Sequence, residues 1–391
     1  MRRIYFDWAA TAPYIDGKDI SAAFGNPSSK HCEGRAAKAA IEEARERCAA
    51  VLKVPPETLY FTSGGTESNS IALFSNLTRK GQGKILASMA EHASIREGME
   101  TLTRMAKPTG KIAVDSSGRV TAETFEKALE KNTDTRFVSI MSVNNETGAV
   151  TDIPSIRNVI RKKTEAGMAL IHFHCDLVQA AGKIPVDIQN WEIDSASISA
   201  HKIGGPRGIG LLYLRRPLEV FYSGGGQEKG VRGGTENTQG AIALAKSLSI
   251  INNEQLTMNN EKAQARMNKL ITALSQIDRC TLIPANRCAA DTALTSHSSL
   301  LPAPCFSPYI LQLAFKDIPG EVMARALDDK GFAVSTGSAC SSSSNERPVL
   351  EAMGVDEKLR VEGIRISQGY TTTDEEIDLL LEAITEVLKF L

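Results

Sequence analysis

Residues 195–210 read SASISAHKIGGPRGIG, a short run of small and β-branched residues that leads into a lysine and then a glycine-rich turn. The run 195–199 is typical of a buried strand, and Lys202 follows its carboxyl end. An amine in that position can lose its hydration, which lowers its pKa toward the range in which lysine forms Schiff bases. Taken alone, however, a lysine at a strand end is more often an ordinary surface residue.

Similar short strands recur along the chain and alternate with amphipathic helical segments. The predicted strands are 58–61, 84–88, 137–143, 169–175, 195–199 and 209–214, and the predicted helices between them are 36–52, 66–79, 95–105 and 153–166. For the last helix, Asp152 is the predicted N-cap and Gly167 follows the end. This alternation predicts a mostly parallel sheet with helices on both faces, and ligands at the carboxyl ends of the strands.

From about Gln239 the pattern changes to a long helical stretch, with interruptions expected at 252–253 and 259–260. The rest of the chain mixes predicted strands at 332–335 and 363–367 with predicted helices at 319–329 and 374–390. We therefore expect a second, smaller α/β domain in this part of the chain.

The composition excludes several classes of protein. The 391 residues carry 45 Lys and Arg against 46 Asp and Glu, and this balance argues against a broad basic surface for nucleic acid or anionic lipid. The first charge comes too early for a signal peptide, and the uncharged run 292–315 contains three prolines that indicate turns rather than a membrane span. Seven cysteines without a CxxC pair fit a reducing compartment. We expect a cytoplasmic protein that binds neither membrane nor nucleic acid directly.

A second chemical feature is the segment 62–69, TSGGTESN, which follows a predicted strand and begins a predicted helix. Glycines and small hydroxyl residues at a helix start present free backbone N–H groups and the positive end of the helix dipole to an anion such as phosphate. Without other features, a capped turn is the commoner explanation of such a segment.

A third feature is the run 170–176, LIHFHCD, with Gln179 three residues later. His172, His174 and Asp176 could together bind a metal ion. Histidines of a buried strand more often form hydrogen bonds within the core, and Asp176 would then be available as the partner of a cationic ring.

Lys202, Asp176 and the anion site at 62–69 together predict pyridoxal 5'-phosphate. This cofactor needs a lysine that forms a Schiff base, a phosphate site and a carboxylate at the pyridine nitrogen. The carboxylate keeps that nitrogen protonated, so that the ring can draw off the electrons left at the α-carbon of the substrate.

The chain resembles the NifS/IscS-like cysteine desulfurases of the class V aminotransferase family from nearly end to end. The most specific matches, which occur in family order, are the segments 62–69, VNNETG at 143–148, SAHK at 199–202, RGGT at 232–235 and STGSAC at 335–340. The resemblance implies the aspartate-aminotransferase-like fold of PLP-dependent transferases, with a large domain over 12–246. Residues 1–11 and 247–391 would form the smaller α/β domain that carries the catalytic cysteine loop.

The resemblance also implies roles around the cofactor ring. Lys202 would hold the cofactor covalently, and Asp176 would pair with the pyridinium nitrogen. Gln179 would donate a hydrogen bond to the phenolic oxygen, while His92 would stack on the ring and assist proton transfer.

Other residues would bind the phosphate and the substrate. The phosphate ligands implied by the family are Gly65, Thr66, Ser199 and His201, with Thr235 contributed to the neighbouring subunit of a homodimer. Asn145 would contact cofactor and substrate, and Arg365 would bind the substrate carboxylate. The residue type supports the last role independently, because a guanidinium binds carboxylates through two parallel hydrogen bonds.

Cys340 decides which reaction follows. It lies among glycine and serine residues that have little to bury, whereas the other six cysteines are expected to be buried and inert. In the family this cysteine attacks the sulfur of L-cysteine, which leaves alanine and an enzyme persulfide for a sulfur-acceptor protein such as an iron–sulfur scaffold or a thiolation enzyme.

Three alternatives to a cysteine desulfurase remain open: a selenocysteine lyase, a class V transaminase and a degenerate, non-enzymatic binding protein of sulfur metabolism. The serine-rich loop of Cys340 argues against a transaminase, and the intact set of Lys202, Asp176, His92 and Cys340 argues against a degenerate protein. The chain also departs from the family pattern between Pro13 and Phe24, where it is shorter by roughly one helix.

Overall fold

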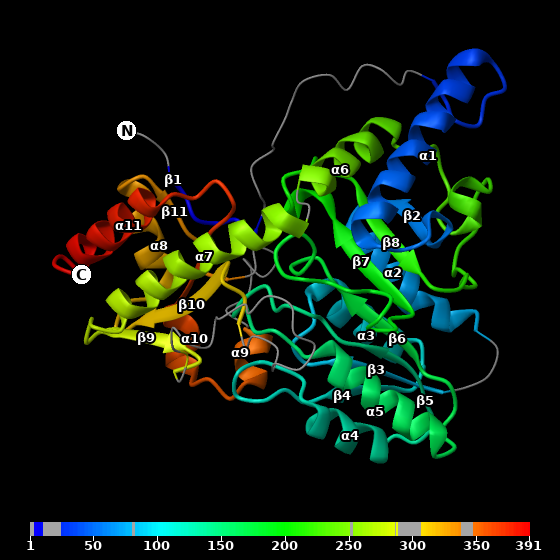
Figure 1. The fold of residues 1–391 in the computed structure, drawn as a ribbon. Helices are drawn as coiled ribbons and strands as arrows, with labels where there is room; N and C mark the ends of the chain where they lie inside the picture. Colours follow the sequence, from blue (N-terminus) through cyan, green and yellow to red (C-terminus); the bar gives the residue numbers. More distant parts are fainter. Residues whose placement is uncertain are drawn as a thin grey trace.

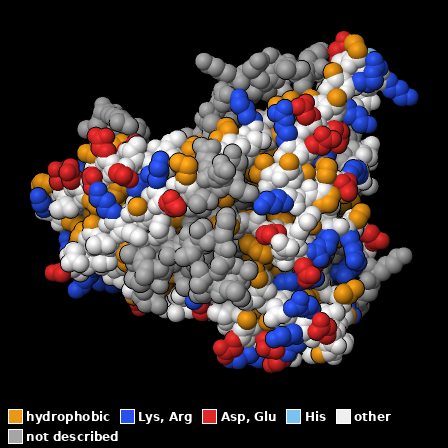
Figure 2. Space-filling view, in the orientation of Figure 1, with side chains coloured by type: hydrophobic (Ala, Val, Ile, Leu, Met, Phe, Trp, Pro, Cys, Tyr) orange, Lys and Arg blue, Asp and Glu red, His pale blue; other side chains and the backbone are white. Residues whose placement is uncertain are grey.

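The computed structural model describes residues 4–10, 25–79, 83–250, 253–285, 287, 306–337 and 347–391. Figure 1 shows two groups of elements, each built around its own sheet. On the face drawn in Figure 2, acidic and basic side chains are interspersed, in keeping with the net charge of −1. Within the described residues, none of the helices combines the length and the apolar composition that a membrane span needs.

The large sheet has seven strands in the order β2-β8-β7-β6-β5-β3-β4. Their bounds are Leu59–Thr62 for β2, Lys84–Ser88 for β3, Thr109–Ile112 for β4, Thr135–Ser139 for β5, His172–Asp176 for β6, Ser195–Ser199 for β7 and Gly210–Leu214 for β8. Strand β8 runs antiparallel to both of its neighbours, and the other pairs are parallel. The mostly parallel sheet that the sequence predicts is therefore confirmed, and its parallel strands end at one common edge.

The helices of this unit are α1 (Cys32–Leu52), α2 (Gly65–Phe74), α3 (Ala93–Arg104), α4 (Ala122–Glu130), α5 (Ile153–Glu165) and α6 (Thr238–Ile250). The apolar residues of α1, α4, α5 and α6 share one core with the central strands, and those of α2 and α3 pack in separate clusters. The central strands β7 and β8 are buried along their whole length. The predicted N-cap of α5 is confirmed, because the Asp152 side chain accepts a hydrogen bond from the Ser155 backbone N–H.

The second unit contains the antiparallel sheet β12-β10-β9 and the parallel pair β1-β11. Its strands are β1 (Ile4–Tyr5), β9 (Cys280–Ile283), β10 (Ile310–Phe315), β11 (Phe332–Ala333) and β12 (Gly363–Ser367), and its helices are α7 (Asn253–Leu274), α8 (Gly320–Asp329), α9 (Pro348–Ala352), α10 (Glu357–Glu362) and α11 (Asp374–Val387). Ile4 and Phe6 pack into the core of this unit, so the start of the chain lies with its carboxyl-terminal part. The division at 12–246 stays a prediction.

The sequence analysis missed two elements and wrongly interrupted a third. Strand β4 and helix α4 were not predicted; β4 is a short edge strand with the sequence TGKI, which lacks an apolar run. Helix α7 continues through 259–260, where an interruption was expected. Asn260 is tolerated there because its side chain is buried and accepts a hydrogen bond of 2.8 Å from the Tyr309 hydroxyl.

Candidate active site

The predicted site residues of the large unit come from the carboxyl edge of its sheet. Asp176 is the last residue of β6, and Lys202 ends the single 3-10 turn that follows β7. The glycines of segment 62–69 begin α2 directly after β2, and His92 precedes α3 just after β3. Parallel strands place such residues together, as the sequence argument expected.

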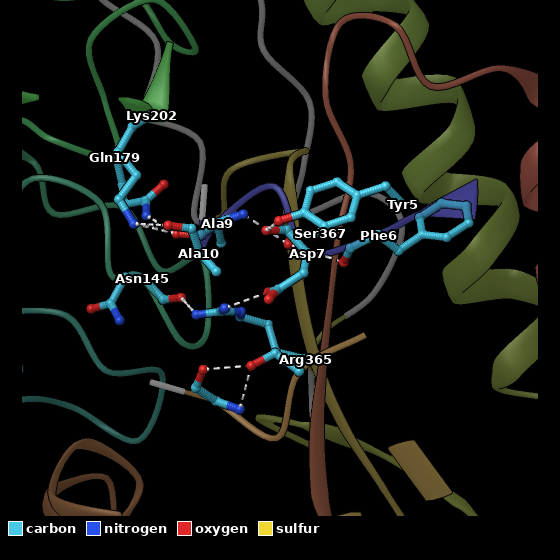
Figure 3. A network of polar contacts seen from close by, with 12 residues as sticks. Tyr5, Phe6, Asp7, Ala9, Ala10, Asn145, Gln179, Lys202, Arg365 and Ser367 are labelled. Carbon is cyan, nitrogen blue, oxygen red and sulfur yellow. Dashed lines mark hydrogen bonds and ion pairs between the residues drawn. The ribbon is translucent and has the colours of Figure 1, made fainter. Parts of the chain in front are cut away.

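The N-terminal segment crosses this edge and contacts the lysine (Figure 3). The Nζ of Lys202 donates hydrogen bonds of 2.6 Å to the Ala9 carbonyl oxygen and 2.7 Å to the Ala10 carbonyl oxygen. The Nε2 of Gln179 donates to the same Ala9 oxygen at 2.9 Å. The amine and the amide therefore face the same small region of the molecule.

The carboxylate of Asp176 is buried and fixed by two donors. Its Oδ2 accepts from Asn69 Nδ2 at 2.8 Å, and its Oδ1 accepts from the Val178 backbone N–H at 2.9 Å. Asn69 also donates to the Ser94 hydroxyl at 2.8 Å. Asn69 belongs to a segment that the sequence argument singled out, but only the structure reveals that it orients Asp176.

The histidines of β6 lie behind Asn69 and form a hydrogen-bonded chain. His174 Nε2 lies 2.9 Å from Asn69 Oδ1, while His174 Nδ1 and His172 Nε2 each lie 2.8 Å from the Ser195 hydroxyl. Burial lowers the pKa of His174 to about 3 and that of His172 to about 4, so both rings are neutral at neutral pH. Because Asn69 Oδ1 can only accept, His174 carries its proton on Nε2.

These hydrogen bonds agree with the expectation that His172 and His174 are partnered within the core. Their nitrogens face Ser195 and Asn69 and form hydrogen bonds with them inside the core. Asp176 is thus left for the role of ring partner that the cofactor hypothesis gives it.

His92 is the N-cap of α3, where its Nδ1 accepts from the Ser94 backbone N–H at 3.1 Å. The same nitrogen lies 2.9 Å from the Ser94 hydroxyl, which can donate to it, so the neutral ring carries its proton on Nε2. Burial lowers the pKa of His92; the charge of Asp176 opposes that shift, and the charge of Lys202 adds to it. The ring is therefore within electrostatic reach of both groups and neutral at neutral pH.

Glu91, which precedes His92 in the sequence, is a buried acid that the sequence analysis did not single out. It accepts hydrogen bonds from the Ser139 hydroxyl at 3.0 Å and the Met141 backbone N–H at 2.6 Å. Burial, with a contribution from the charge of Asp176, raises its pKa to about 8. Glu91 joins the ends of β3 and β5 and thereby fixes the backbone that carries His92.

The predicted phosphate side lies at the start of α2. No side chain caps this helix, whose N-cap is Gly64, so its first backbone N–H groups are available to an anion. A Cβ added at Gly65 would lie 2.7 Å from a Val178 methyl and 3.7 Å from the Ser199 Cβ, which shows how closely the turn approaches β7. Thr66 is exposed beside them.

His201 and Thr235 complete the set of predicted phosphate ligands. Burial and the nearby charges of Lys202 and Arg207 lower the pKa of His201 to about 4. Thr235 is exposed on the irregular segment that precedes α6. A single chain does not test its predicted contact with a neighbouring subunit.

Arg365 reaches the site from β12, in the other unit. Its Nη1 donates to the Asn145 carbonyl oxygen at 2.8 Å and its Nη2 to Asp7 Oδ1 at 2.7 Å (Figure 3). The side chain is 2% exposed. Each terminal nitrogen keeps one N–H for a substrate carboxylate. Asp7, which orients the guanidinium, was not predicted, because it lies 358 positions away in the sequence.

Cys340 lies outside the described residues, which stop at Gly337 and resume at Arg347. A Cβ added at Gly337 would collide with Arg347 Nη1, so these two flanks lie against each other. Ser335, just before them, exchanges two backbone hydrogen bonds with Arg365. The described flank at Ser335 therefore lies next to the predicted substrate-binding arginine.

The expectation for the other cysteines needs one correction. Cys48 and Cys175 are buried, and burial raises the pKa of both thiols, that of Cys48 to about 12. Cys280 is half-buried, with its pKa also raised to about 12. Cys32, however, is exposed, because it begins the first turn of α1, where neighbouring residues are also exposed. Cys288 and Cys305 lie outside the described residues.

Comparisons with known proteins give the same assignment along the whole chain. A model of the aminotransferase class-V family matches residues 4–380. The cysteine desulfurase IscS of Shewanella sediminis is 34% identical over 400 residues, which cover 98% of this chain and 92% of that protein. A solved NifS-like protein superposes with a TM-score of 0.86 at 33% identity over the full length of both chains. SspA, solved in complex with cysteine, superposes with a TM-score of 0.74 at 28% identity over 95% of this chain and 100% of that one.

The chain therefore belongs to the class-V aminotransferase family, which uses pyridoxal 5'-phosphate. Within that family it groups with the IscS- and NifS-like cysteine desulfurases. The predicted family and the predicted fold are both confirmed.

The role of Asn69 can be tested by its replacement with leucine. Asn69→Leu removes the donor to Asp176 and leaves the Nε2 proton of His174 with only the Ser197 hydroxyl, 3.5 Å away, as an acceptor among the described residues. Because each lost contact involves a buried polar group, we expect the free energy of unfolding to fall by about 1–3 kcal/mol and the affinity for pyridoxal 5'-phosphate to fall about tenfold. Urea unfolding and equilibrium dialysis measure the two effects. Reduced stability with unchanged affinity would show that Asn69 only supports the core.

Proposed function

We propose that this protein is a PLP-dependent cysteine desulfurase that converts L-cysteine to L-alanine and passes the sulfur to Cys340 as a persulfide. The observation that carries the proposal is the convergence of an amine, a fixed carboxylate and an uncapped helix start at one sheet edge, next to an arginine from the other unit. Similarity to cysteine desulfurases over nearly the full chain supports it.

The described residues fit the cofactor. The Lys202 amine would bond to it after leaving the carbonyl oxygens of Ala9 and Ala10, and Asp176 would face the pyridine nitrogen. Gln179 has one Nε2 proton beyond its hydrogen bond to Ala9, which can be donated to the phenolic oxygen. When bound, the cofactor supplies an electron sink for the α-carbon of the substrate.

The remaining residues bind the amino acid and move protons. Arg365 would hold the substrate carboxylate through the two N–H groups that Asp7 and Asn145 leave, and so fix the α-carbon next to Lys202. His92, neutral and with its proton on Nε2 because Nδ1 accepts from the Ser94 backbone N–H, is suited to proton transfer through Nε2.

Sulfur transfer balances without an external oxidant. The Cys340 thiolate forms a bond to the substrate sulfur while the bond between that sulfur and the substrate β-carbon breaks. The electron pair left on carbon takes up a proton, so the products are alanine and a persulfide on Cys340. We propose that a partner protein in the cytoplasm, such as an iron–sulfur scaffold or a thiolation enzyme, then accepts the sulfur.

The proposal is tested with purified protein, pyridoxal 5'-phosphate and L-cysteine. We expect a visible absorbance band from the bound cofactor, and alanine in amounts equal to the sulfide that a mild reductant releases. Faster turnover of L-selenocysteine without need of Cys340 would favour a selenocysteine lyase, and amino-group transfer to pyruvate would favour a transaminase. A colourless, inactive protein would indicate a binding protein.

We also propose a homodimer in which Thr235 contributes to the phosphate site of the partner subunit. The segment before Thr235 is polar and glycine-rich, yet it exposes Phe221 and Tyr222, at 53% and 45% of their surface. Large exposed aromatic side chains mark contact surfaces. Sedimentation equilibrium should show a dimer, and Thr235→Ala should weaken cofactor binding while the dimer persists. A fully active monomer would contradict the shared site.

A further inference from the structure

Lys183 is a buried lysine that the proposed mechanism does not use. Its side chain lies in the loop after β6 and is buried, with 7% of the residue exposed. Among the described residues, its amine makes one hydrogen bond, of 2.6 Å, to Gln179 Oε1, and none of their carboxylates pairs with it. A buried ammonium without a counter-ion destabilises a fold, so such a residue needs another reason to be there.

We propose that Lys183 is a positioning residue for the cofactor: its ammonium fixes the amide orientation of Gln179, so that Nε2 rather than Oε1 faces the phenolic oxygen. The inference rests on the proposed function. Gln179 is held at both ends of its amide, because Oε1 accepts from Lys183 while Nε2 donates to the Ala9 oxygen. Without Lys183, the amide could rotate by half a turn and present its oxygen to an anionic ligand atom, which it would repel.

Lys183 also lies next to the lysine that would bond the cofactor. Both amines line a small cavity of about 20 Å³, together with Trp8 and Tyr370. A cavity of that size can hold one water molecule, which would give the Lys183 ammonium a second acceptor. Lys183 and Lys202 therefore lie across a short gap from each other, and like charges on the two amines repel.

The charges around Lys183 support this arrangement. Burial, with contributions from the charges of Lys202 and Arg365, lowers the pKa of Lys183 to about 7. Lys183 in turn contributes to the lowered pKa of His201. Since the amine has an ordinary pKa of 10.5 in the unfolded chain, its protonation opposes folding. The loss of folding free energy caused by this protonation is fully present below about pH 7 and disappears as the pH rises toward 10.5.

The experiment compares apoprotein and loaded protein of the wild type, Lys183→Met, Gln179→Leu and the double variant, with the exposed Lys127→Met as a control. Methionine keeps the volume of the side chain and removes its charge, so the Lys183→Met apoprotein should melt at the same or a higher temperature than wild type at pH 6. Its dissociation constant for pyridoxal 5'-phosphate should nevertheless rise about fivefold. In the loaded variant, the pH midpoint of the visible absorbance change should move up by about one unit.

The double variant separates orientation from other effects. If Lys183 acts through Gln179, then Lys183→Met should cause no further loss of cofactor affinity in the Gln179→Leu background. Losses of affinity that simply add in the double variant would overturn the inference. So would a Lys183→Met protein with wild-type cofactor affinity, an unmoved absorbance midpoint or a melting temperature below that of wild type. A wild-type protein that binds no cofactor would instead contradict the proposed function itself.

Discussion

Lys202→Ala is expected to yield a folded protein that no longer holds pyridoxal 5'-phosphate covalently and that turns over L-cysteine at least about a thousandfold more slowly. The reason is that Lys202 supplies an amine at the carboxyl edge of the sheet, where Asp176 ends β6 and α2 begins. The fold itself should persist, because the hydrogen bonds of Lys202 to the carbonyl oxygens of Ala9 and Ala10 contribute little to the stability of a chain of this size.

Borohydride reduction of the loaded wild-type protein, followed by peptide mapping, checks this assignment. The reduced cofactor should be found on the peptide that contains Lys202 and on no other. Lys229→Ala is a suitable control, because Lys229 is an exposed lysine that hydrogen-bonds only the Glu57 carbonyl oxygen among the described residues. An adduct on Lys183 or any other lysine would overturn the assignment of Lys202.

Cys340→Ala should separate cofactor chemistry from sulfur transfer. The variant should still bind the cofactor and change its absorbance on addition of L-cysteine, since Lys202, Asp176 and Arg365 remain. Alanine formation should fall by at least about a thousandfold, because no nucleophile is left to take the sulfur. The neighbouring serines cannot replace the thiol, because a hydroxyl is far less nucleophilic than a thiolate and forms no persulfide.

Cys32→Ala is the matched control for this experiment. Cys32 is an exposed thiol at the start of α1, and it is not one of the residues of the candidate site. Its removal should leave alanine formation and persulfide content unchanged. If Cys340→Ala made alanine at the wild-type rate, the lyase or transaminase interpretation would replace the desulfurase.

Local patterns predicted much of the fold. The buried runs at 84–88, 195–199 and 363–367 match β3, β7 and β12 at both ends, because short apolar strands between turn residues leave little choice of boundary. Strand β4 escaped prediction, since an edge strand needs no apolar run. Helix α7 was interrupted in the prediction at Asn260, where a tertiary hydrogen bond to Tyr309 outweighs the low helix propensity of asparagine.

The candidate site was predictable as a set of chemical groups but not as a network. Asp176 and Lys202 could be found because each follows a buried strand, and motif order supplied His92, Gln179 and Arg365. The partners that orient them could not be found in this way. Asn69, Asp7 and Lys183 act through hydrogen bonds to residues whose own placement depends on the complete fold, and no local pattern distinguishes them from other polar residues.

The central claim is that Cys340 receives the sulfur of L-cysteine, and mass spectrometry of the protein tests it most directly. Loaded wild-type protein would be mixed with L-cysteine, trapped with an alkylating reagent without reductant, and digested. We predict that the peptide containing Cys340 gains one sulfur atom, in an amount equal to the alanine formed in the first turnover. The peptide containing Cys32 should gain none. Alanine without any sulfur on Cys340, or a persulfide on another cysteine, would contradict the account.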